Sequence, residues 1–415
     1  MIEYGLVGES LGHSHSPEIH GMISDYKYEL IEVPRDEIDG FFDKRDFKGL
    51  NVTIPYKETV IPHLDVIDGA AREIGAVNTV VVRDGKLIGY NTDCIGMRGA
   101  MLRAGIDIKG KKVLICGTGG TSKTAAYVAK ALGAGETVFL SRGKKDGCAT
   151  YEEAYDVHRD AGIIINTTPS GMFPNEESCP IDLSHFPALS GVFDAIFNPQ
   201  RTNLVQDAMR RGIPAAGGLY MLVSQAVASS EIFTGKRAPE GLCDRIYETL
   251  SREKENIVLT GMPSSGKTTV GKKIASSLGR DFIDTDELIV TAEGVTIPEI
   301  FSAHGEGYFR EAERRAVREA ASHRGVVIAT GGGAVLRPEN VRALARSGRI
   351  YFLDRSPEFL IATGDRPLSS DRAALEARYR ERIDIYRATC DVIINSNGTV
   401  GEAAREILEE FDQRR

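Results

Sequence analysis

Short apolar runs alternate with helical patterns along the chain. In the first hundred residues the apolar runs are Tyr4–Val7, Tyr28–Val33 and Leu50–Ile54, and stretches with helical spacing separate them. Strands that alternate with helices favour a parallel sheet. Val80–Ile88 predicts a hairpin, because Asp84-Gly85 suits a tight turn with positive φ. The chain therefore begins with a predicted α/β domain.

A second alternating pattern starts at Lys112. The apolar run Val113–Cys116 leads into Gly117-Thr-Gly-Gly-Thr121, and the helical stretch Ser122–Leu132 follows. This order of strand, glycine-rich turn and helix is typical of a dinucleotide-binding domain. Further strands are predicted at Thr137–Leu140, Gly162–Asn166 and Gly191–Ala195, and helices at about Leu219–Phe233 and Leu242–Leu250.

A third pattern centres on Gly261-Met-Pro-Ser-Ser-Gly-Lys-Thr268. The apolar run Ile257–Thr260 precedes it, and helical spacing continues through Val270 and Ile274. A chance glycine-rich turn has no reason to sit between a strand and a helix, so we interpret this motif as a phosphate-binding P-loop. In such a loop Lys267 reaches the phosphates and the Thr268 hydroxyl holds Mg²⁺. A P-loop strand normally opens its own domain, so residues before 256 form a separate unit.

Composition narrows the class of protein. The 415 residues are 42% hydrophobic and 27% charged, and the net charge of −8 argues against general affinity for nucleic acid or anionic membranes. The six cysteines lack paired spacing, which predicts free thiols. Because the chain has no run of 18 apolar residues and no basic leader after Met1, we expect a cytoplasmic protein.

Polar residues follow the predicted strands of the first half. They are hydroxyls, carboxamides, one lysine and one carboxylate, a set that suits a small polyhydroxylated acid. Singly each has a structural explanation: Ser-x-Ser-Pro can cap a helix, Asn78 can form a turn, and Lys57 can be a solvated charge. The set comprises Ser14, Ser16, Asn51, Thr53, Lys57, Asn78 and Asp93.

Taken together, seven ordered motifs in residues 1–250 resemble shikimate dehydrogenase. They are Gly12-His-Ser-His-Ser-Pro-Glu-Ile-His, Asn51-Val-Thr-Ile-Pro-Tyr-Lys, Gly75-Ala-Val-Asn-Thr, Asn91-Thr-Asp, Gly117-Thr-Gly-Gly, Asn166-Thr-Thr-Pro-Ser-Gly-Met and Gly218-Leu-Tyr-Met-Leu-Val-Ser-Gln. The resemblance implies a catalytic pair of Lys57 and Asp93. It also implies substrate contacts from Ser14, Ser16, Asn51, Thr53, Lys57, Asn78, Asp93 and Gln225. Reduction of a ketone builds negative charge on oxygen, which a nearby proton donor relieves.

The same resemblance implies a nicotinamide cofactor in the second domain. Ser122 stands where a full G-x-G-x-x-G has its last glycine, so the glycine pattern alone is weak. The end of the next strand distinguishes better between NAD and NADP. That strand ends in Leu140-Ser-Arg-Gly-Lys-Lys145, and Arg142 suits a 2′-phosphate, which favours NADP over NAD. The family more often has Asn-Arg-Thr there. The expected cofactor contacts are Gly117, Thr118, Gly119, Gly120, Thr121, Ser141, Arg142, Lys145, Gly218 and Met221.

Phe197, in Asp194-Ala-Ile-Phe-Asn-Pro, is a second departure from the family, which commonly has tyrosine at that position. A hydroxyl near the substrate carboxylate would be lost, unless Phe197 is a core residue. Quinate dehydrogenase is the close relative to exclude, and the paired Ser14 and Ser16 favour the shikimate-specific form.

In the second half, two carboxylates follow the apolar pair Phe282-Ile283. Asp284 and Asp286 lie two residues apart at a predicted strand end, so we expect them to point the same way. One suits Mg²⁺ and the other a hydroxyl nucleophile. Phe309-Arg-Glu-Ala-Glu313 is predicted to open a helix. Val326–Gly333 is predicted to form a buried strand that ends in three glycines.

These features resemble shikimate kinase over residues 256–412. The resemblance implies catalysis by Lys267 and Asp286 and a metal site of Thr268 and Asp284. Arg382-Ile-Asp-Ile-Tyr departs from the family's Arg-x-Pro-Leu-Tyr, and we interpret Arg378, Arg380 and Arg387 as a solvated basic face. Expected substrate contacts are Asp286, Arg310, Gly332, Gly333 and Arg382. Expected ATP contacts are Gly261, Ser264, Ser265, Gly266, Lys267, Thr268, Thr269 and the lid residue Arg366.

The product of the first half is then the substrate of the second. We predict an α/β protein with a substrate domain (1–102 and 219–250), a Rossmann-like NADP domain (103–218), a linker (251–256) and a P-loop kinase domain (257–415). It would reduce 3-dehydroshikimate with NADPH and phosphorylate shikimate with ATP and Mg²⁺, as a monomer or homodimer that binds neither nucleic acid nor membrane. The alternative is a non-catalytic sensor, which would not need Lys57, Asp93, Lys267 and Asp286.

Overall fold

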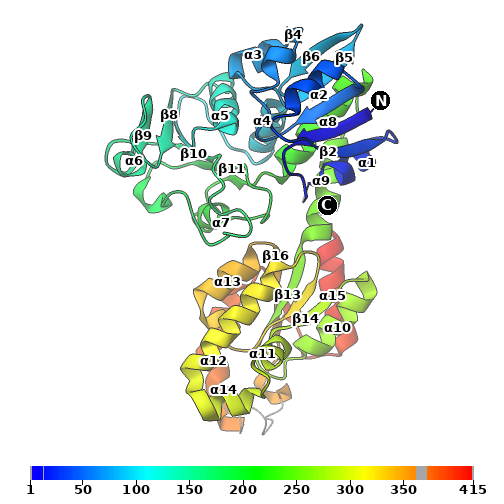
Figure 1. Ribbon diagram of the computed structural model, residues 1–415. Coiled ribbons are helices and arrows are strands. Elements are labelled where there is room, and N and C mark those ends of the chain that lie inside the picture. The colour runs from blue at the N-terminus through cyan, green and yellow to red at the C-terminus, as the bar shows by residue number, and fades with distance from the viewer. Residues whose placement is uncertain (1, 13, 361–371, 414–415) are drawn as a thin grey trace. The chain divides into compact units, whose positions relative to one another are not determined.

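The computed structural model describes residues 2–12, 14–360 and 372–413. By its internal contacts the chain divides into two compact units, residues 1–249 and 250–415 (Figure 1). Among the described helices, none combines the length and apolar character needed to cross a membrane. All six cysteines are free thiols, as expected.

The first sheet of unit 1 is mixed: the three strands that we expected to be parallel are parallel, and the predicted hairpin adds antiparallel pairs. β1 pairs in parallel with β2 and β3, but β5 runs antiparallel to β3 and forms the predicted hairpin with β6. The hairpin is the physical reason: its tight turn reverses the chain, which a parallel sheet cannot accommodate. The order is β2-β1-β3-β5-β6-β4. The strands are β1 (Ile2–Gly8), β2 (Tyr28–Glu32), β3 (Phe47–Val52), β4 (Val66–Ile67), β5 (Thr79–Arg83) and β6 (Lys86–Tyr90).

Helices from both ends of unit 1 cover this sheet. α8, late in the chain of this unit, packs against α4 and α1. Two of its buried residues, Ser229 and Phe233, contact residues of the first sheet. The helices here are α1 (Ser16–Ile23), α2 (Ile38–Lys44), η1 (Ile61–His63), α3 (Gly69–Ile74), α4 (Asp93–Arg103) and α8 (Leu219–Thr234).

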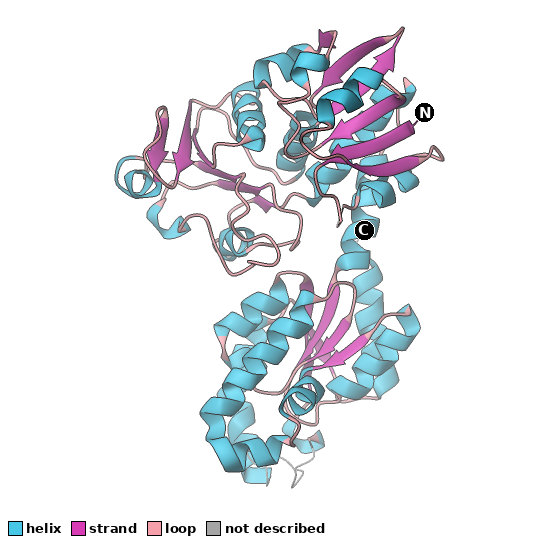
Figure 2. Ribbon diagram, viewed as in Figure 1, coloured by secondary structure: helices cyan, strands magenta, loops and turns pink. Residues whose placement is uncertain are grey.

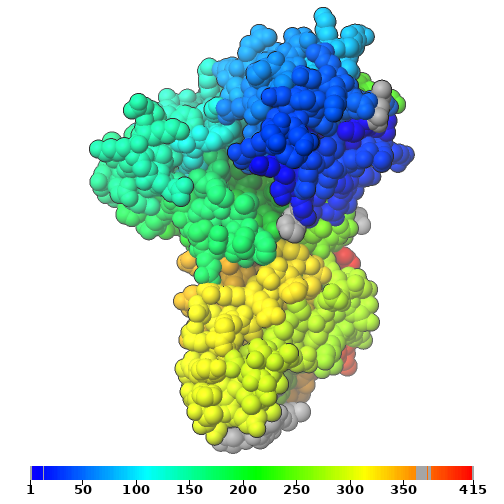
Figure 3. Space-filling view, viewed as in Figure 1, coloured from blue at the N-terminus to red at the C-terminus, as the bar shows by residue number. Residues whose placement is uncertain are grey.

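The second sheet of unit 1 is parallel throughout, in the order β12-β11-β10-β7-β8-β9. It forms a second lobe, coloured teal to green in Figure 3 beside the blue first lobe. Its strands are β7 (Lys112–Cys116), β8 (Glu136–Ser141), β9 (Cys148–Thr150), β10 (Ile163–Asn166), β11 (Gly191–Asp194) and β12 (Ala215–Ala216). Its helices are α5 (Gly120–Ala131), α6 (Tyr151–Val157), η2 (Leu183–His185) and α7 (Asn203–Arg210).

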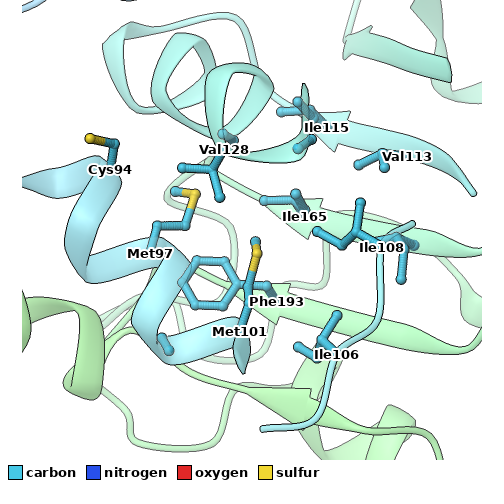
Figure 4. Close-up of a cluster of buried hydrophobic side chains, with 14 of the residues drawn as sticks. Cys94, Met97, Met101, Ile106, Ile108, Val113, Ile115, Val128, Ile165 and Phe193 are labelled. Atoms are coloured by element: carbon cyan, nitrogen blue, oxygen red, sulfur yellow. The ribbon is translucent and has the colours of Figure 1, made fainter. Parts of the chain in front are cut away.

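A buried cluster fixes α4 to this second sheet (Figure 4). Met97 and Met101 of α4 are fully buried against Ile115 of β7, Ile165 of β10 and Phe193 of β11. Burying a side chain of this size contributes roughly 1.5–3 kcal/mol. The helix whose first residue is Asp93 is thus held by the lobe that carries the glycine-rich turn.

Unit 2 has a single parallel sheet between two layers of helices (Figure 2). α10 and α15 pack on one face, and α12 and α13 on the other. The strand order is β14-β15-β13-β16-β17, with β13 (Asn256–Thr260), β14 (Phe282–Asp284), β15 (Val327–Ala329), β16 (Gly348–Asp354) and β17 (Val392–Asn395). The helices are α10 (Lys267–Leu278), α11 (Thr285–Glu293), α12 (Ile297–Ser322), η3 (Ala334–Leu336), α13 (Pro338–Ala345), η4 (Pro357–Phe359), α14 (Arg372–Thr389) and α15 (Val400–Gln413).

Most of the expected linker, residues 251–256, lies in regular secondary structure. Residues 251–254 continue helix α9 (Leu242–Lys254), and Asn256 already begins β13. Arg252, Glu253 and Lys254 are strong helix formers, so their polarity did not mark a break in structure. Ile246 and Leu250 supply the buried side of the helix.

Candidate active sites

A cavity of about 510 Å³ in unit 1 contains all eight substrate residues that we predicted. Residues of the second lobe, Thr121, Ala195 and Phe197, contribute to its wall, so both lobes form the cavity. The predicted set comprises Ser14, Ser16, Asn51, Thr53, Lys57, Asn78, Asp93 and Gln225. These residues come from separate strands and helices, and the fold brings them together.

Lys57 and Asp93 form an ion pair at this cavity. Lys57 Nζ donates to Asp93 Oδ2 over 2.6 Å, and only 18% and 10% of the two side chains are exposed. Asp93 is the first residue of α4, where the backbone N–H groups of the helix favour a negative charge. Water screens a half-buried pair less than a surface pair. The two opposite charges therefore attract each other strongly across this short contact.

Two asparagines of the cavity wall also join its elements. Asn51 Oδ1 accepts from the Tyr28 hydroxyl over 2.7 Å, and its Nδ2 donates to Ser229 Oγ of α8 over 2.8 Å. Asn78 Oδ1 accepts from the Thr92 backbone N–H over 2.7 Å. Thr92 immediately precedes Asp93, so Asn78 fixes the start of α4 and with it the carboxylate.

Three further residues bear on this cavity and were not among our predicted contacts. His15 and Phe197 line it, with their rings edge to face at 5.9 Å between centroids. Phe197 is thus a wall residue instead of a core residue. Behind the wall, the His20 ring stacks on Tyr28 at 3.8 Å, and burial lowers the pKa of His20 to about 3. The neutral His20 ring thus packs against the tyrosine that donates to Asn51. The sequence motif that contains His20 was recognised, but this packing role was not predicted.

The glycine-rich turn lies between β7 and α5 and fits a phosphate group. Gly117 has φ 107°, and a Cβ there would stand 2.8 Å from Thr167 Oγ1. Beside the turn, Lys145 Nζ donates to Thr118 Oγ1 over 3.1 Å, and Arg142 is exposed just beyond β8. Of the other expected cofactor contacts, Thr121, Gly218 and Met221 line the cavity. Turn, helix N-terminus and basic residues form the donor set that a phosphorylated dinucleotide needs.

Unit 2 has a cavity of about 750 Å³ that extends from the P-loop to α12 and α14. Ser264, Gly266, Lys267, Thr268 and Thr269 line one end, and Asp284, Asp286, Arg310, Gly332, Gly333 and Arg382 line the rest. Gly261 and Ser265 lie behind the lining, and Ser265 is buried. Arg366 lies outside the described residues.

The P-loop lysine donates hydrogen bonds to the backbone of its own loop. Lys267 Nζ donates to the carbonyl oxygens of Gly261 and Met262 over 3.0 and 2.9 Å. Thr268 Oγ1 donates to Asp284 Oδ2 over 2.8 Å, which joins the two groups expected to hold Mg²⁺. A hydroxyl with one carboxylate fits that metal, which commonly takes its other ligands from phosphate and water.

Asp286 does not lie at a strand end, as we had expected. Asp284 ends β14 and caps α11 by accepting from the Asp286 backbone N–H over 3.0 Å, so Asp286 lies in the first helical turn. The cap decides this, because a side chain that accepts from the residue two positions on starts a helix. Both carboxylates nevertheless line the cavity.

Arg310 lies near the start of the second helical segment of α12, which begins a few residues before the predicted Phe309. The kink that we missed is at Gly305, with φ 77° and ψ 177° inside the helix. Arg310 Nη2 donates to Glu306 Oε1 and its Nη1 to Glu313 Oε2, both over 2.9 Å. Burial raises the pKa of Glu313, whereas the neighbouring positive charge of Arg310 acts to lower it. A Cβ on Gly333 would collide with the Arg310 guanidinium, so a larger residue there would displace the arginine from its present position.

The arginines of α14 divide differently from our expectation. Arg382 is buried, and its Nη1 donates to the Gly332 carbonyl oxygen over 3.4 Å. Arg380 and Arg387 are exposed, as predicted, but Arg378 is half-buried and lines the cavity. Arg378 and Arg382 are four residues apart and therefore share a helix face. That spacing was the signal for Arg378, which we had assigned to the solvated face.

Known proteins resemble both units. The family model for the shikimate dehydrogenase substrate binding domain matches residues 6–80, and that for the shikimate 5′-dehydrogenase C-terminal domain matches residues 218–243. A shikimate dehydrogenase (NADP(+)) of Clostridium perfringens is 36% identical over 265 residues, which cover 60% of this chain and 97% of that enzyme. The chain belongs to the shikimate dehydrogenase family.

Solved structures agree with this family. A shikimate 5-dehydrogenase from Thermus thermophilus in complex with NADP(H) and shikimate is 27% identical, with a TM-score of 0.54 over 60% of this chain and 99% of that one. A quinate dehydrogenase from Corynebacterium glutamicum in complex with NAD is also 27% identical, with a TM-score of 0.54, and covers 60% of this chain and 98% of that one. The fold of the dehydrogenase is thus shared by enzymes of two substrates.

The kinase lies in the remaining part of the chain. Residues 263–412 match the shikimate kinase family model, which covers the P-loop from Pro263 onward, both carboxylates and α14. The protein therefore joins a shikimate dehydrogenase to a shikimate kinase and is a bifunctional enzyme of the shikimate pathway.

Proposed function

We propose that the dehydrogenase reduces 3-dehydroshikimate to shikimate with NADPH and that the kinase converts shikimate to shikimate 3-phosphate with ATP and Mg²⁺. The observation that carries the first step is the Lys57–Asp93 pair at 2.6 Å in a cavity lined with hydroxyl and amide groups. The relatives named for NADP support the choice of cofactor. In this proposal residues 1–102 and 219–250 bind the substrate, and residues 103–218 bind NADP.

The dehydrogenase residues divide into those that hold the ligands and those that move a proton. NADPH supplies the hydride when bound, and Gly117, Gly119 and Gly120 of the turn approach its phosphates. Ser14 and Ser16 bind polar groups of the substrate. As the ketone oxygen gains negative charge, Lys57 gives it a proton, and Asp93 stabilises the lysine in its charged form.

In the kinase, charge stabilisation and proton acceptance fall to different residues. ATP with Mg²⁺ supplies the phosphoryl group when bound, and Thr268 and Asp284 would hold the metal. Lys267 stabilises the charge that develops on the phosphate oxygens, together with the N-terminus of α10. Asp286 accepts the proton of the attacking hydroxyl, and Arg310 and Arg382 bind the substrate carboxylate.

One cuvette can test both steps in succession. NADPH oxidation should require 3-dehydroshikimate, and ADP release should then require shikimate. NADPH oxidation without ADP release would overturn the kinase proposal alone, and the reverse would overturn the dehydrogenase proposal. Absence of both would favour a sensor that only binds these molecules.

Quinate oxidation is the second candidate for the dehydrogenase, because a quinate dehydrogenase shares its fold. Ser14 and Ser16, which line the cavity together, favour shikimate. Oxidation of quinate and shikimate should be compared at equal concentrations with NADP⁺ and with NAD⁺. A kcat/KM for quinate equal to that for shikimate would contradict the shikimate-specific assignment. Monomeric or dimeric assembly and a cytoplasmic location stay predictions.

A further inference from the structure

Helix α14 presents two arginines to the kinase cavity. Arg378 and Arg382 both line it, one helical turn apart, whereas Arg380 between them is exposed. Only Arg382 matches the motif from which we predicted the site. Arg378 therefore has a position in the cavity without a role in the proposed mechanism.

The charges around Arg378 place it at the end of the cavity formed by α12 and α14. Burial lowers its pKa, and the neighbouring charge of Arg382 lowers it further. Glu381 and Glu306 act in the opposite direction, and Arg310 in the same direction as Arg382. All these groups belong to α12 or α14. Arg378 therefore lies at the end of the cavity away from the P-loop, where the substrate would bind.

The three arginines at this end of the cavity lie near one another and near acidic residues of α12 and α14. Arg310 lies between two carboxylates, Glu306 and Glu313, and donates to both. Arg378 and Arg382 are like charges four residues apart, which repel on a helix. Among the described residues, Arg382 Nε is buried without a hydrogen-bond partner. An anion that bridges the two guanidinium groups would relieve the repulsion and satisfy this N–H.

We propose that Arg378 binds the carboxylate of shikimate together with Arg382 and thereby determines specificity for an anionic substrate. This assignment rests on the proposed kinase function. Planar guanidinium groups match a carboxylate in two-point contacts, and two of them from one helix face hold it more tightly than one. Because the carboxylate does not change during phosphoryl transfer, Arg378 contributes equally to the ground state and to the transition state.

Arg378→Met tests the assignment, with Arg378→Lys to restore charge and Arg380→Met as a control on the exposed side of the same helix. Loss of a charge-assisted hydrogen bond should raise the KM for shikimate by about 10-fold or more in Arg378→Met. The values of kcat and of the KM for ATP should stay within about twofold, because uniform binding affects KM alone. Arg378→Lys should recover part of the affinity, and Arg380→Met should behave like the parent protein.

The primary amide of shikimate sharpens the test because it keeps the shape of the substrate without its charge. The parent protein and Arg378→Met should use the amide equally well, so the variant should lose only its preference for the acid. A KM for shikimate within twofold of the parent would overturn the assignment, as would an equal loss for acid and amide. A rise confined to the KM for ATP would move Arg378 to the nucleotide. If the parent releases no ADP with shikimate, the proposed kinase function fails, and the assignment fails with it.

Discussion

The two lysines of the active sites are held in opposite ways. Lys57 donates to a carboxylate at 2.6 Å, so its charge is balanced within the protein. Lys267 donates to two backbone carbonyl oxygens, which carry no net charge. A lysine coupled to a carboxylate suits proton transfer, and a lysine held by neutral dipoles suits stabilisation of phosphate charge. The surroundings of each lysine thus match a different kind of catalysis.

The largest effect is expected from removing the lysine that transfers a proton. Lys57→Met should lower the kcat of the dehydrogenase by about 10²–10⁴-fold, the usual contribution of a positioned acid or base. Lys57→Arg should lose almost as much, because arginine keeps the ion pair but does not release its proton. Kinase activity in the same preparations should be unchanged, and the exposed Lys86→Met serves as control. A Lys57→Arg variant with near-parental turnover would contradict a proton-transfer role.

Loss of the P-loop lysine should affect only the kinase. Lys267→Met should lower its kcat by about 10²–10³-fold, the size expected for one preorganised charge. Lys273→Met, on the exposed side of α10, is the matched control. Dehydrogenase kinetics should match the parent in both variants. If Lys267→Met also abolished reduction in a folded protein, the two sites would not be independent.

A smaller effect is expected for the cofactor preference. Arg142→Asp should lower kcat/KM for NADPH relative to NADH by roughly 10–100-fold, because the 2′-phosphate loses a charge-assisted partner. Initial rates with both cofactors at saturating 3-dehydroshikimate measure the ratio. Arg159→Asp, exposed in the same lobe, controls for the change in net charge. An unchanged ratio would assign the 2′-phosphate to other residues.

The sequence predicted much of this arrangement because motifs mark strand ends. Lys57 follows β3 and Asp93 follows β6, and because these two strands run in the same direction, their carboxyl ends lie at one edge of the sheet. The P-loop was equally clear, because its spacing and its flanking strand and helix are constrained by the backbone. Such local constraints are visible in a single chain.

What failed depended on side-chain choices that local patterns leave open. Asp284 could end a strand or cap a helix, and its bond to the Asp286 backbone decides for the cap. The charged segment 251–254 could be irregular or helical, and it continues helix α9. Arg378 could face water or the cavity, and only the position of α14 resolves the choice. These outcomes required tertiary contacts.

Two buried carboxylates of unit 1 also differ in whether their partners are charged or neutral. Asp93 is balanced by Lys57, but Asp194, at the end of β11, has neutral partners. It accepts from Thr202 Oγ1, Asn166 Nδ2 and the Ile196 backbone N–H at 2.7, 3.0 and 3.1 Å. Burial outweighs these bonds and raises its pKa to about 7. The folded chain therefore keeps a proton that the unfolded chain releases near pH 4.

The sign of the effect follows from the proton count. Between about pH 4 and 7 the folded state binds more protons than the unfolded state at this site, so stability falls as the pH rises. From pH 6 to 8 the loss should be about 1 kcal/mol. Asp194→Asn should abolish this part of the pH dependence, because its oxygen can accept two bonds and its Nδ2 can donate to Thr202 Oγ1.

Urea unfolding at pH 6, 7 and 8, followed by circular dichroism, measures the difference between parent and variant. The transition of unit 1 is identified by the loss of dehydrogenase activity, and the exposed Asp156→Asn is the control. The stability of the parent should fall relative to Asp194→Asn as the pH rises, while kcat stays similar because Asp194 does not line the cavity. If the difference were constant across this range, Asp194 would be ionised throughout, and three neutral donors would suffice to hold a buried charge.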